Sequence, residues 1–314
     1  IEACRRAKAL PRLVWPRWTP RVSRLLKFML PALLGAGVVQ INLLIDVILA
    51  SILPTGSVSY LYYADRLNQL PLAVIGIAIG TALLPNMSRN IQAGRLQEAK
   101  ENQEKSLEIG LILTIPAAFG LMILSDSIIT ALFQHGAFDT ESAAATAIAL
   151  VCYSAGLPAF VIIKIFQPNF FARHDTTTPV KIAAGSVVIN LMLNLILMQY
   201  FGHAGLAMAT SIAAWLSAAI FAIVLKNRNL YSPRRKLLVK ITRIILAASV
   251  MGLGLVALKE FSGGFAESSR LLGICVLLLL IFCGGFIYFI SLFLFNGISK
   301  EEIVENLKRW SVRD

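Results

Sequence analysis

The sequence predicts an all-α polytopic membrane protein with about eight transmembrane helices and both ends on the cytoplasmic side. Its 314 residues are 57% hydrophobic and only 15% charged, and the mean hydropathy is +0.73, which is typical of membrane proteins. Long apolar segments recur along the chain, and the basic residues gather between them. An apolar helix of about 20 residues is long enough to cross about 30 Å of hydrocarbon.

The chain opens with a basic segment, residues 1–27, in which eight Lys or Arg accompany one acid, Glu2. We expect a cytoplasmic connector here, and a tail that faces anionic lipid is compatible with the same composition. Eight apolar spans follow this segment. They are expected at residues 28–53, 58–86, 107–133, 142–167, 178–200, 203–226, 240–259 and 270–296.

The loops between the spans predict the orientation of the chain. All but three of the 29 Lys and Arg residues lie in segments that this arrangement places on one side of the membrane. The exceptions are Lys259 and Arg270 in the last outer loop and Arg66 within the second span. Because cytoplasmic loops carry the excess of basic residues, the alternation predicts an even number of spans. The net charge of +12 then requires no nucleic-acid partner.

Two polar segments are predicted to form amphipathic helices on the cytoplasmic surface. One is residues 92–105, and the other is the tail 297–314, in which Ser299 and Glu302 form a capping box. The sequence contains no HExxH, GxSxG, Walker or CxxC motif. It therefore argues against an enzyme.

The second span carries two adjacent charges, Asp65 and Arg66, although a charge in the hydrocarbon costs about 2.5–3.5 kcal/mol. We interpret them as part of a polar cavity for a charged ligand. The guanidinium of Arg66 suits phosphate, and Ser59 and Tyr62 precede it on a compatible face. Asp65 is expected to pair with Arg66 or to orient it. The alternative is a structural ion pair within the bundle.

A second polar set is spread over the first, fifth and sixth spans. Asn190 and Asn194 have i, i+4 spacing and face the same way, and Asp46 and Thr210 are expected at a similar depth. One carboxylate with amide and hydroxyl oxygens suits a small cation such as sodium, provided that the three spans meet. The alternative is ordinary hydrogen bonding between helices.

Residues 56–85, GSVSYLYYADRLNQLPLAVIGIAIGTALLP, resemble the MurJ/MviN family of lipid II flippases, part of the multidrug/oligosaccharidyl-lipid/polysaccharide exporter superfamily. The resemblance continues through FQHGAF, FFARHDTTTPVKIAAGSVVINLMLNLILM and GHAGLAMATSIAAW. The family has fourteen spans, in two six-helix lobes and a terminal pair. The resemblance implies that this chain is a fragment without the first lobe. It divides the chain into a second lobe at 28–226, a basic loop at 227–239, a terminal pair with a lipid-tail groove at 240–296, and a cytoplasmic tail.

The resemblance also implies a function. Family members move lipid II, the undecaprenyl-pyrophosphate-linked peptidoglycan precursor, from the inner to the outer leaflet of the bacterial inner membrane by alternating access. Arg66 matches a cavity arginine proposed to engage the pyrophosphate, Asp65 matches its acidic neighbour, and Ser59 matches a cavity-lining serine. Gln69 stands where some relatives carry an acid.

The same resemblance extends to the cation set. Asp46, Asn190, Asn194 and Thr210 match the sodium-site positions of one branch of the family, and Asn194 replaces an acid there. The implied partners are lipid II, membrane lipids and the first lobe, with sodium as the one implied cofactor. Two alternatives stay open: a related exporter of drugs or polysaccharide lipid intermediates, and a non-transporting membrane scaffold for wall synthesis.

Overall fold

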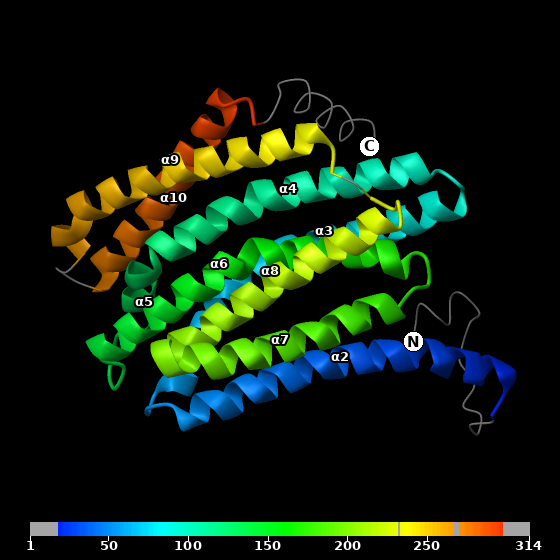
Figure 1. Ribbon diagram of the computed structural model, residues 1–314. Helices are drawn as coiled ribbons and strands as arrows, with labels where there is room; N and C mark the ends of the chain where they lie inside the picture. The colour runs from blue at the N-terminus through cyan, green and yellow to red at the C-terminus, as the bar shows by residue number, and fades with distance from the viewer. Residues whose placement is uncertain (1–17, 232, 267–269, 298–314) are drawn as a thin grey trace, which may run out of the picture.

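A computed structural model describes residues 18–231, 233–266 and 270–297 as a bundle of long α-helices that run roughly alongside one another (Figure 1). The predicted connector, up to residue 17, and the predicted tail from residue 298 lie outside the described residues. The helices are α2 (Pro20–Ile52), α3 (Ser57–Gln92), α4 (Leu96–Ile123), α5 (Ser125–Phe133), α6 (Thr140–Phe171), α7 (Thr177–Phe201), α8 (His203–Asn227), α9 (Arg235–Ala266) and α10 (Arg270–Leu294).

The prediction of an all-α membrane protein with many spans is confirmed. Within the described residues, seven helices are long and apolar enough to cross a membrane, namely α3, α4, α6, α7, α8, α9 and α10. The first predicted span, residues 28–53, falls within the 33-residue helix α2, whose described apolar part is the shorter segment Gln40–Ile52. The described residues therefore contain about seven candidate spans where eight were expected.

Two predicted elements differ from the structure. The third predicted span, 107–133, is divided into α4 and α5 at the buried Leu124, whose N–H is bonded to the carbonyl of Gly120. The polar segment 92–105 is not a separate surface helix. A turn at Gly94, where φ is +74°, ends α3, and the polar residues that follow form the first turns of α4. No helix breaker separates them from the apolar residues, so the helix simply continues.

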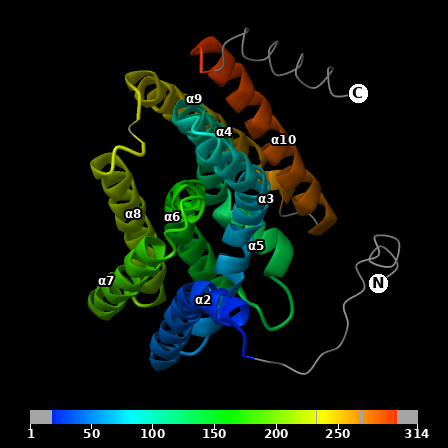
Figure 2. The same ribbon diagram turned by 90° about the vertical axis from the view of Figure 1, so that its right-hand side faces the viewer.

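Helix α6 lies at the centre of the bundle and packs against α3, α4 and α8 (Figure 2). Small residues permit this close packing. A Cβ atom on Gly156 of α6 would lie 2.9 Å from the Cα of Ser211 in α8, so only glycine fits there. Helix α7 packs against α8 and α2, which places α2, α7 and α8 next to one another.

The last two helices form a pair that attaches to the rest of the bundle mainly through α4. The hydroxyl of Tyr288 in α10 donates to the carbonyl of Ile112 in α4 at 2.7 Å. Near the beginning of α9, Lys240 pairs with Glu108 of α4, and Arg234 in the preceding loop pairs with Glu101 at 3.2 Å. The pair is therefore joined to α4 both at its middle and at one end.

Candidate functional site

The first polar cluster forms around Asp46 of α2. Its Oδ1 accepts a hydrogen bond from Nδ2 of Asn194 in α7 at 2.7 Å, and its Oδ2 accepts from Nδ2 of Asn42, one turn earlier, at 3.1 Å. Asn194 also donates to Oδ1 of Asn190 at 2.9 Å, and Asn190 donates to Oγ1 of Thr210 in α8 at 3.3 Å. The structure thus brings together all four residues of the predicted cation set.

The side-chain amide of Asn190 is best satisfied with its oxygen and nitrogen exchanged. It then donates to Oδ1 of Asp46 at 3.2 Å and to Oδ1 of Asn42 at 3.1 Å, and its oxygen accepts from the N–H of Thr210 at 3.2 Å. Hydrogen bonding therefore satisfies these contacts without a cation. The side-chain oxygen of the buried Asn194 has no hydrogen-bond partner among the described residues. This oxygen and the carboxylate of Asp46 are of the kind that suits a cation.

Asn42 was absent from the predicted set. Its signal in the sequence was the i, i+4 spacing to Asp46, which repeats the spacing of Asn190 and Asn194. Across the described residues, no group of three His, Cys, Asp or Glu side chains is placed to hold a metal ion. A cation held here would therefore be coordinated mainly by neutral oxygens around one carboxylate.

The second polar site lies on α3. The side chain of Arg66 is exposed, and its guanidinium carbon lies 4.9 Å from the ring centroid of Tyr62, one turn earlier, which is 55% exposed. Ser59 is exposed two turns before Arg66. Among the described residues, Arg66 forms no salt bridge. Its guanidinium is therefore available to an anion.

Asp65 does not form an ion pair with its neighbour Arg66. Its carboxylate accepts a hydrogen bond from the amide of Gln69, one turn later. Adjacent residues of a helix point to different sides, which explains why Asp65 and Arg66 diverge. Asp65 instead lies within electrostatic reach of Asp46, and the buried Tyr153 of α6 is close to both. The two polar sites therefore adjoin one another.

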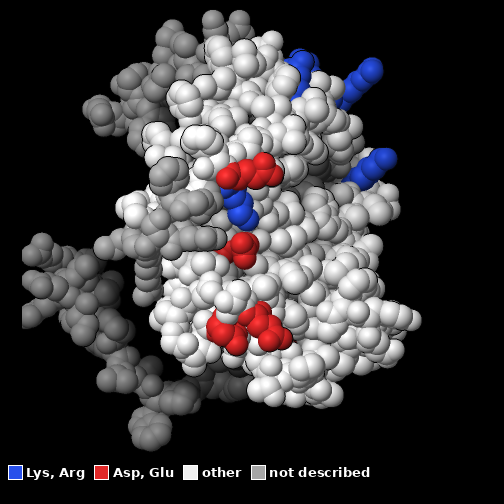
Figure 3. All heavy atoms as spheres, turned by 90° about the vertical axis from the view of Figure 1, so that its left-hand side faces the viewer, with Lys and Arg blue, Asp and Glu red and all other residues white. Residues whose placement is uncertain are grey.

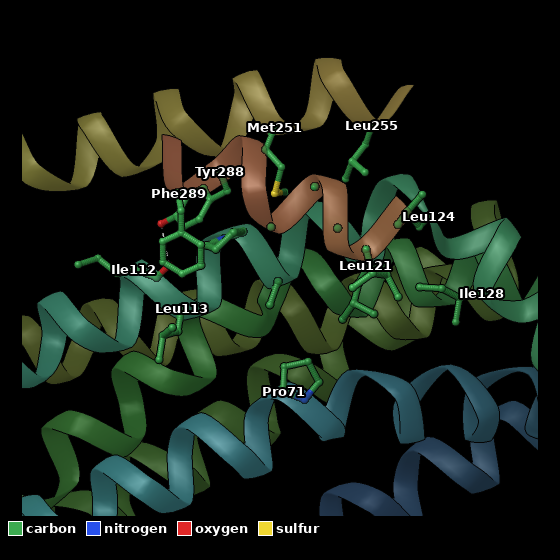
Figure 4. Close-up of a pocket in the computed structure, with 16 residues that line it drawn as sticks. Pro71, Ile112, Leu113, Leu121, Leu124, Ile128, Met251, Leu255, Tyr288 and Phe289 are labelled. Carbon is green, nitrogen blue, oxygen red and sulfur yellow. Dashed lines mark hydrogen bonds between the residues drawn. The ribbon is translucent and has the colours of Figure 1, made fainter. Parts of the chain in front are cut away.

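An apolar cavity of about 350 Å³ lies between the terminal pair and the lobe (Figure 4). Pro71 of α3 and Leu121 of α4 form one side, and Met251 of α9 and Phe289 of α10 form the other. The hydroxyl of Tyr288 at its edge is already bonded to Ile112, so it adds no unpaired polar group. A hydrocarbon chain fits this surface.

A third polar group joins the α6–α7 loop, the first turn of α7 and the end of α8. Oδ1 of Asp175 accepts from the backbone N–H of Thr178 at 3.0 Å, and its Oδ2 lies 2.6 Å from the guanidinium of Arg228. Partial burial would raise the pKa of Asp175, but the hydrogen bonds from Thr178 and Arg228 outweigh it and hold the pKa below its usual value.

A family model described as "Lipid II flippase MurJ" matches residues 1–276. The chain is 41% identical over 299 residues to a probable lipid II flippase MurJ of Rhizobium meliloti (strain 1021), covering 94% of this chain and 55% of that protein. It is 38% identical over 301 residues to the corresponding protein of Rhizobium tropici, covering 95% of this chain and 56% of that protein. The chain thus spans about half the length of the curated relatives it matches.

Solved structures agree with this fold. A lipid II flippase MurJ in an inward closed conformation superposes with a TM-score of 0.72 at 26% identity, covering 91% of this chain and 57% of that one. An outward-facing multidrug transporter of the MATE family superposes with a TM-score of 0.56 at 20% identity, covering 85% of this chain and 61% of that one. At that identity, the second likeness concerns the fold alone.

Proposed function

The chain belongs to the MurJ family of lipid II flippases, and from that premise we propose that it forms half of a transporter that moves lipid II across the bacterial inner membrane. The cargo passes from the inner to the outer leaflet for cell-wall synthesis. The family consists of transporters rather than enzymes. The chain contributes one wall of a central cavity, and a first lobe outside this chain contributes the other.

The observation that carries this proposal is the exposed guanidinium of Arg66 on a membrane-spanning helix. A permanently charged, planar group without a carboxylate partner suits the pyrophosphate of a lipid carrier. Tyr62 and Ser59 extend the same face, with Tyr62 holding the guanidinium against its ring. Asp65 accepts a hydrogen bond from Gln69 and forms no salt bridge with Arg66 among the described residues, although the two opposite charges still attract each other.

We assign the parts of the chain as follows. Residues 28–226 form the second six-helix lobe, and residues 240–296 form the terminal pair. The basic segments 1–27 and 227–239 and the amphipathic tail 297–314 lie in the cytoplasm. Eight spans with both ends inside follow from this division. Figure 3, a view of the end proposed to be external, supports the orientation, because that end shows few charged side chains of either sign.

The apolar cavity beside α9 and α10 is proposed to hold the lipid tail. Its lining is almost entirely hydrocarbon, and it lies between the lobe and the terminal pair. Because the surrounding lipid is as apolar as this lining, an isoprenoid chain enters without a desolvation cost and is held by van der Waals packing, without any specific polar contact.

Sodium is proposed to bind at Asp46, Asn190, Asn194 and Thr210, with Asn42 as an additional oxygen donor. The carboxylate of Asp46 and the side-chain oxygen of the buried Asn194, which has no hydrogen-bond partner among the described residues, support this assignment. When bound, the ion would supply a positive charge that compensates Asp46. The cavity then keeps the positive charge of Arg66, and a potential that is negative inside favours its return by about 2.3 kcal/mol per charge per 100 mV.

The proposal is tested with Arg66→Gln in the intact protein. We expect it to abolish both lipid II translocation in proteoliposomes and rescue of cells depleted of their own flippase, at normal membrane levels. Arg89→Gln is the matched control: it removes the same charge from the last turn of the same helix, where Arg89 is exposed and bonded to Asn86. Full activity of Arg66→Gln would favour a non-transporting scaffold. Export of a drug or polysaccharide intermediate in place of lipid II would favour a related exporter.

A further inference from the structure

A second cavity, of about 400 Å³, lies between α6, α7 and α8 and is edged by α2 and α3. Unlike the apolar cavity of Figure 4, it has polar side chains along much of its length. Asn190 and Thr210, two members of the oxygen cluster, line it directly. The cavity therefore begins at the proposed cation site.

The remaining polar residues lead away from that site toward the end proposed to be cytoplasmic. Ser186 precedes Asn190 by one turn of α7, and Ser217 follows Thr210 by two turns of α8. Lys164 and Gln167 of α6 also line the cavity. At about 1.5 Å per residue, Lys164 is about 10 Å from the cytoplasmic end of its helix, whereas Asn190 is about 20 Å from the same end of α7.

Ser217 is a polar group without a protein partner. It is only 4% exposed, and its hydroxyl finds no hydrogen-bond partner among the described residues. An unsatisfied buried hydroxyl costs about 1–3 kcal/mol, so such groups are normally paired with protein or with ordered water. A hydrated cavity satisfies this hydroxyl, whereas a dry one does not.

We propose that this cavity is a hydrated route by which a monovalent cation passes between the oxygen cluster and the cytoplasmic side of the lobe. The inference rests on the proposed cation site and adds the direction from which the ion reaches or leaves it. Lys164 stands at the inner end of the route. Its stem packs over Gly76 of α3, where a Cβ atom would lie 2.6 Å from Cδ of Lys164, and its ammonium repels cations and limits leakage.

The route is tested by cysteine accessibility in the intact protein. The native cysteines are replaced by Ala, and Ser186→Cys and Ser217→Cys are made singly. A membrane-impermeant, positively charged methanethiosulfonate is then added from either side. We expect modification to be at least ten times faster from the cytoplasmic side and to slow when sodium replaces choline. Val188→Cys is the matched control because Val188 lies on the opposite face of α7 and is 52% exposed. Rates equal to this control at both serine positions would overturn the route.

The role of Lys164 is tested in the Ser186→Cys background with Lys164→Gln. The substitution should speed modification by the positively charged reagent at least threefold and slow that by its negatively charged sulfonate analogue. An unchanged ratio of the two rates would remove Lys164 from the route.

Equilibrium binding of radioactive sodium distinguishes this inference from the proposed function. Binding that depends on Asp46, together with inaccessible cysteines, would overturn the route and leave the cation site standing. Accessible cysteines without sodium binding or sodium protection would overturn the cation site and, with it, the route.

Discussion

The cluster around Asp46 and the face around Arg66 both place charge inside the membrane, but they treat it differently. Asp46 is held by two donors, Asn42 and Asn194, from two helices. Arg66 is exposed, with the ring of Tyr62 against its guanidinium, and among the described residues it forms no salt bridge. The first side chain is thus held by neighbouring helices, whereas the second is accessible.

Under the proposed function, this difference separates two tasks. The oxygens around one carboxylate are proposed to select a small cation, and the exposed guanidinium is proposed to bind an anionic ligand. Asp65 lies between them: it is bonded to Gln69 and within electrostatic reach of Asp46. The following predictions separate the two sites.

The largest effect is expected for Asp46→Asn. It removes the one carboxylate of the oxygen cluster, and a unit charge at about 4 Å is worth about 4 kcal/mol at an effective dielectric constant of about 20. We expect sodium binding to weaken by roughly a hundredfold or more, measured with radioactive sodium on the intact protein. Arg66→Gln should leave sodium binding unchanged. If both variants lost sodium equally, the two sites would have to be treated as one.

A smaller effect of opposite sign is expected for Asn194→Asp. A second carboxylate beside Asp46 increases the attraction for a cation and, without one, repels the first. Sodium should bind roughly tenfold more tightly, and the melting temperature should depend more strongly on sodium concentration than in the unsubstituted protein. Weaker binding would argue that Asn194 serves only to hydrogen-bond the helices.

At the site around Arg66, Tyr62→Leu removes the aromatic ring that contacts the guanidinium of Arg66. Cation–π contacts at exposed sites are worth about 0.5–1 kcal/mol, so the apparent affinity for lipid II should fall about two- to fivefold. Tyr62→Phe keeps the ring and should behave like the parent in the same translocation assay. A loss with Phe as large as with Leu would assign the effect to the hydroxyl.

The smallest effect is expected on the stability of the protein at low pH, through Asp175, which lies outside both sites. Because its folded-state pKa is lowered, this group adds stability above its unfolded pKa of about 4 and loses it as the pH falls through the folded pKa. The pair with Arg228 is partly exposed, so the contribution is below about 1 kcal/mol. Melting at pH 7 and pH 3.5 should show a smaller acid-induced change in Asp175→Asn. The Asp175→Asn variant should bind sodium normally at pH 7. A loss of sodium binding in this variant would show that Asp175 contributes to the site around Asp46.

Much of the fold follows from local sequence. Apolar length and the alternation of basic loops place the spans within a few residues of α3, α6, α7 and α8, because these signals depend on neighbouring residues alone. The break at Leu124 was missed because the apolar residues before it and the apolar residues after Ser125, Asp126 and Ser127 were joined into one span, although these three polar residues mark the start of a new helix. The turn at Gly94 was missed because its residues are as polar as the helical turns that follow.

The sequence predicted which residues form the site better than it predicted the contacts between them. The four cation residues were grouped by depth and spacing, and the structure brings them together. The bond between Asp65 and Gln69 was missed in favour of an ion pair with Arg66. The cavity lined by Lys164 and Ser217 depends on how α6, α7 and α8 pack together. Packing between distant segments cannot be predicted from any one of them alone.

The attachment of α9 and α10 has one more consequence. Tyr288 bonds the pair to the middle of α4, and Glu101 and Glu108 hold it near the beginning of that helix. A motion of α4 would therefore carry α9 and α10 with it. Under the proposed function, the proposed sites for the lipid tail and for the pyrophosphate would then keep a constant separation during transport.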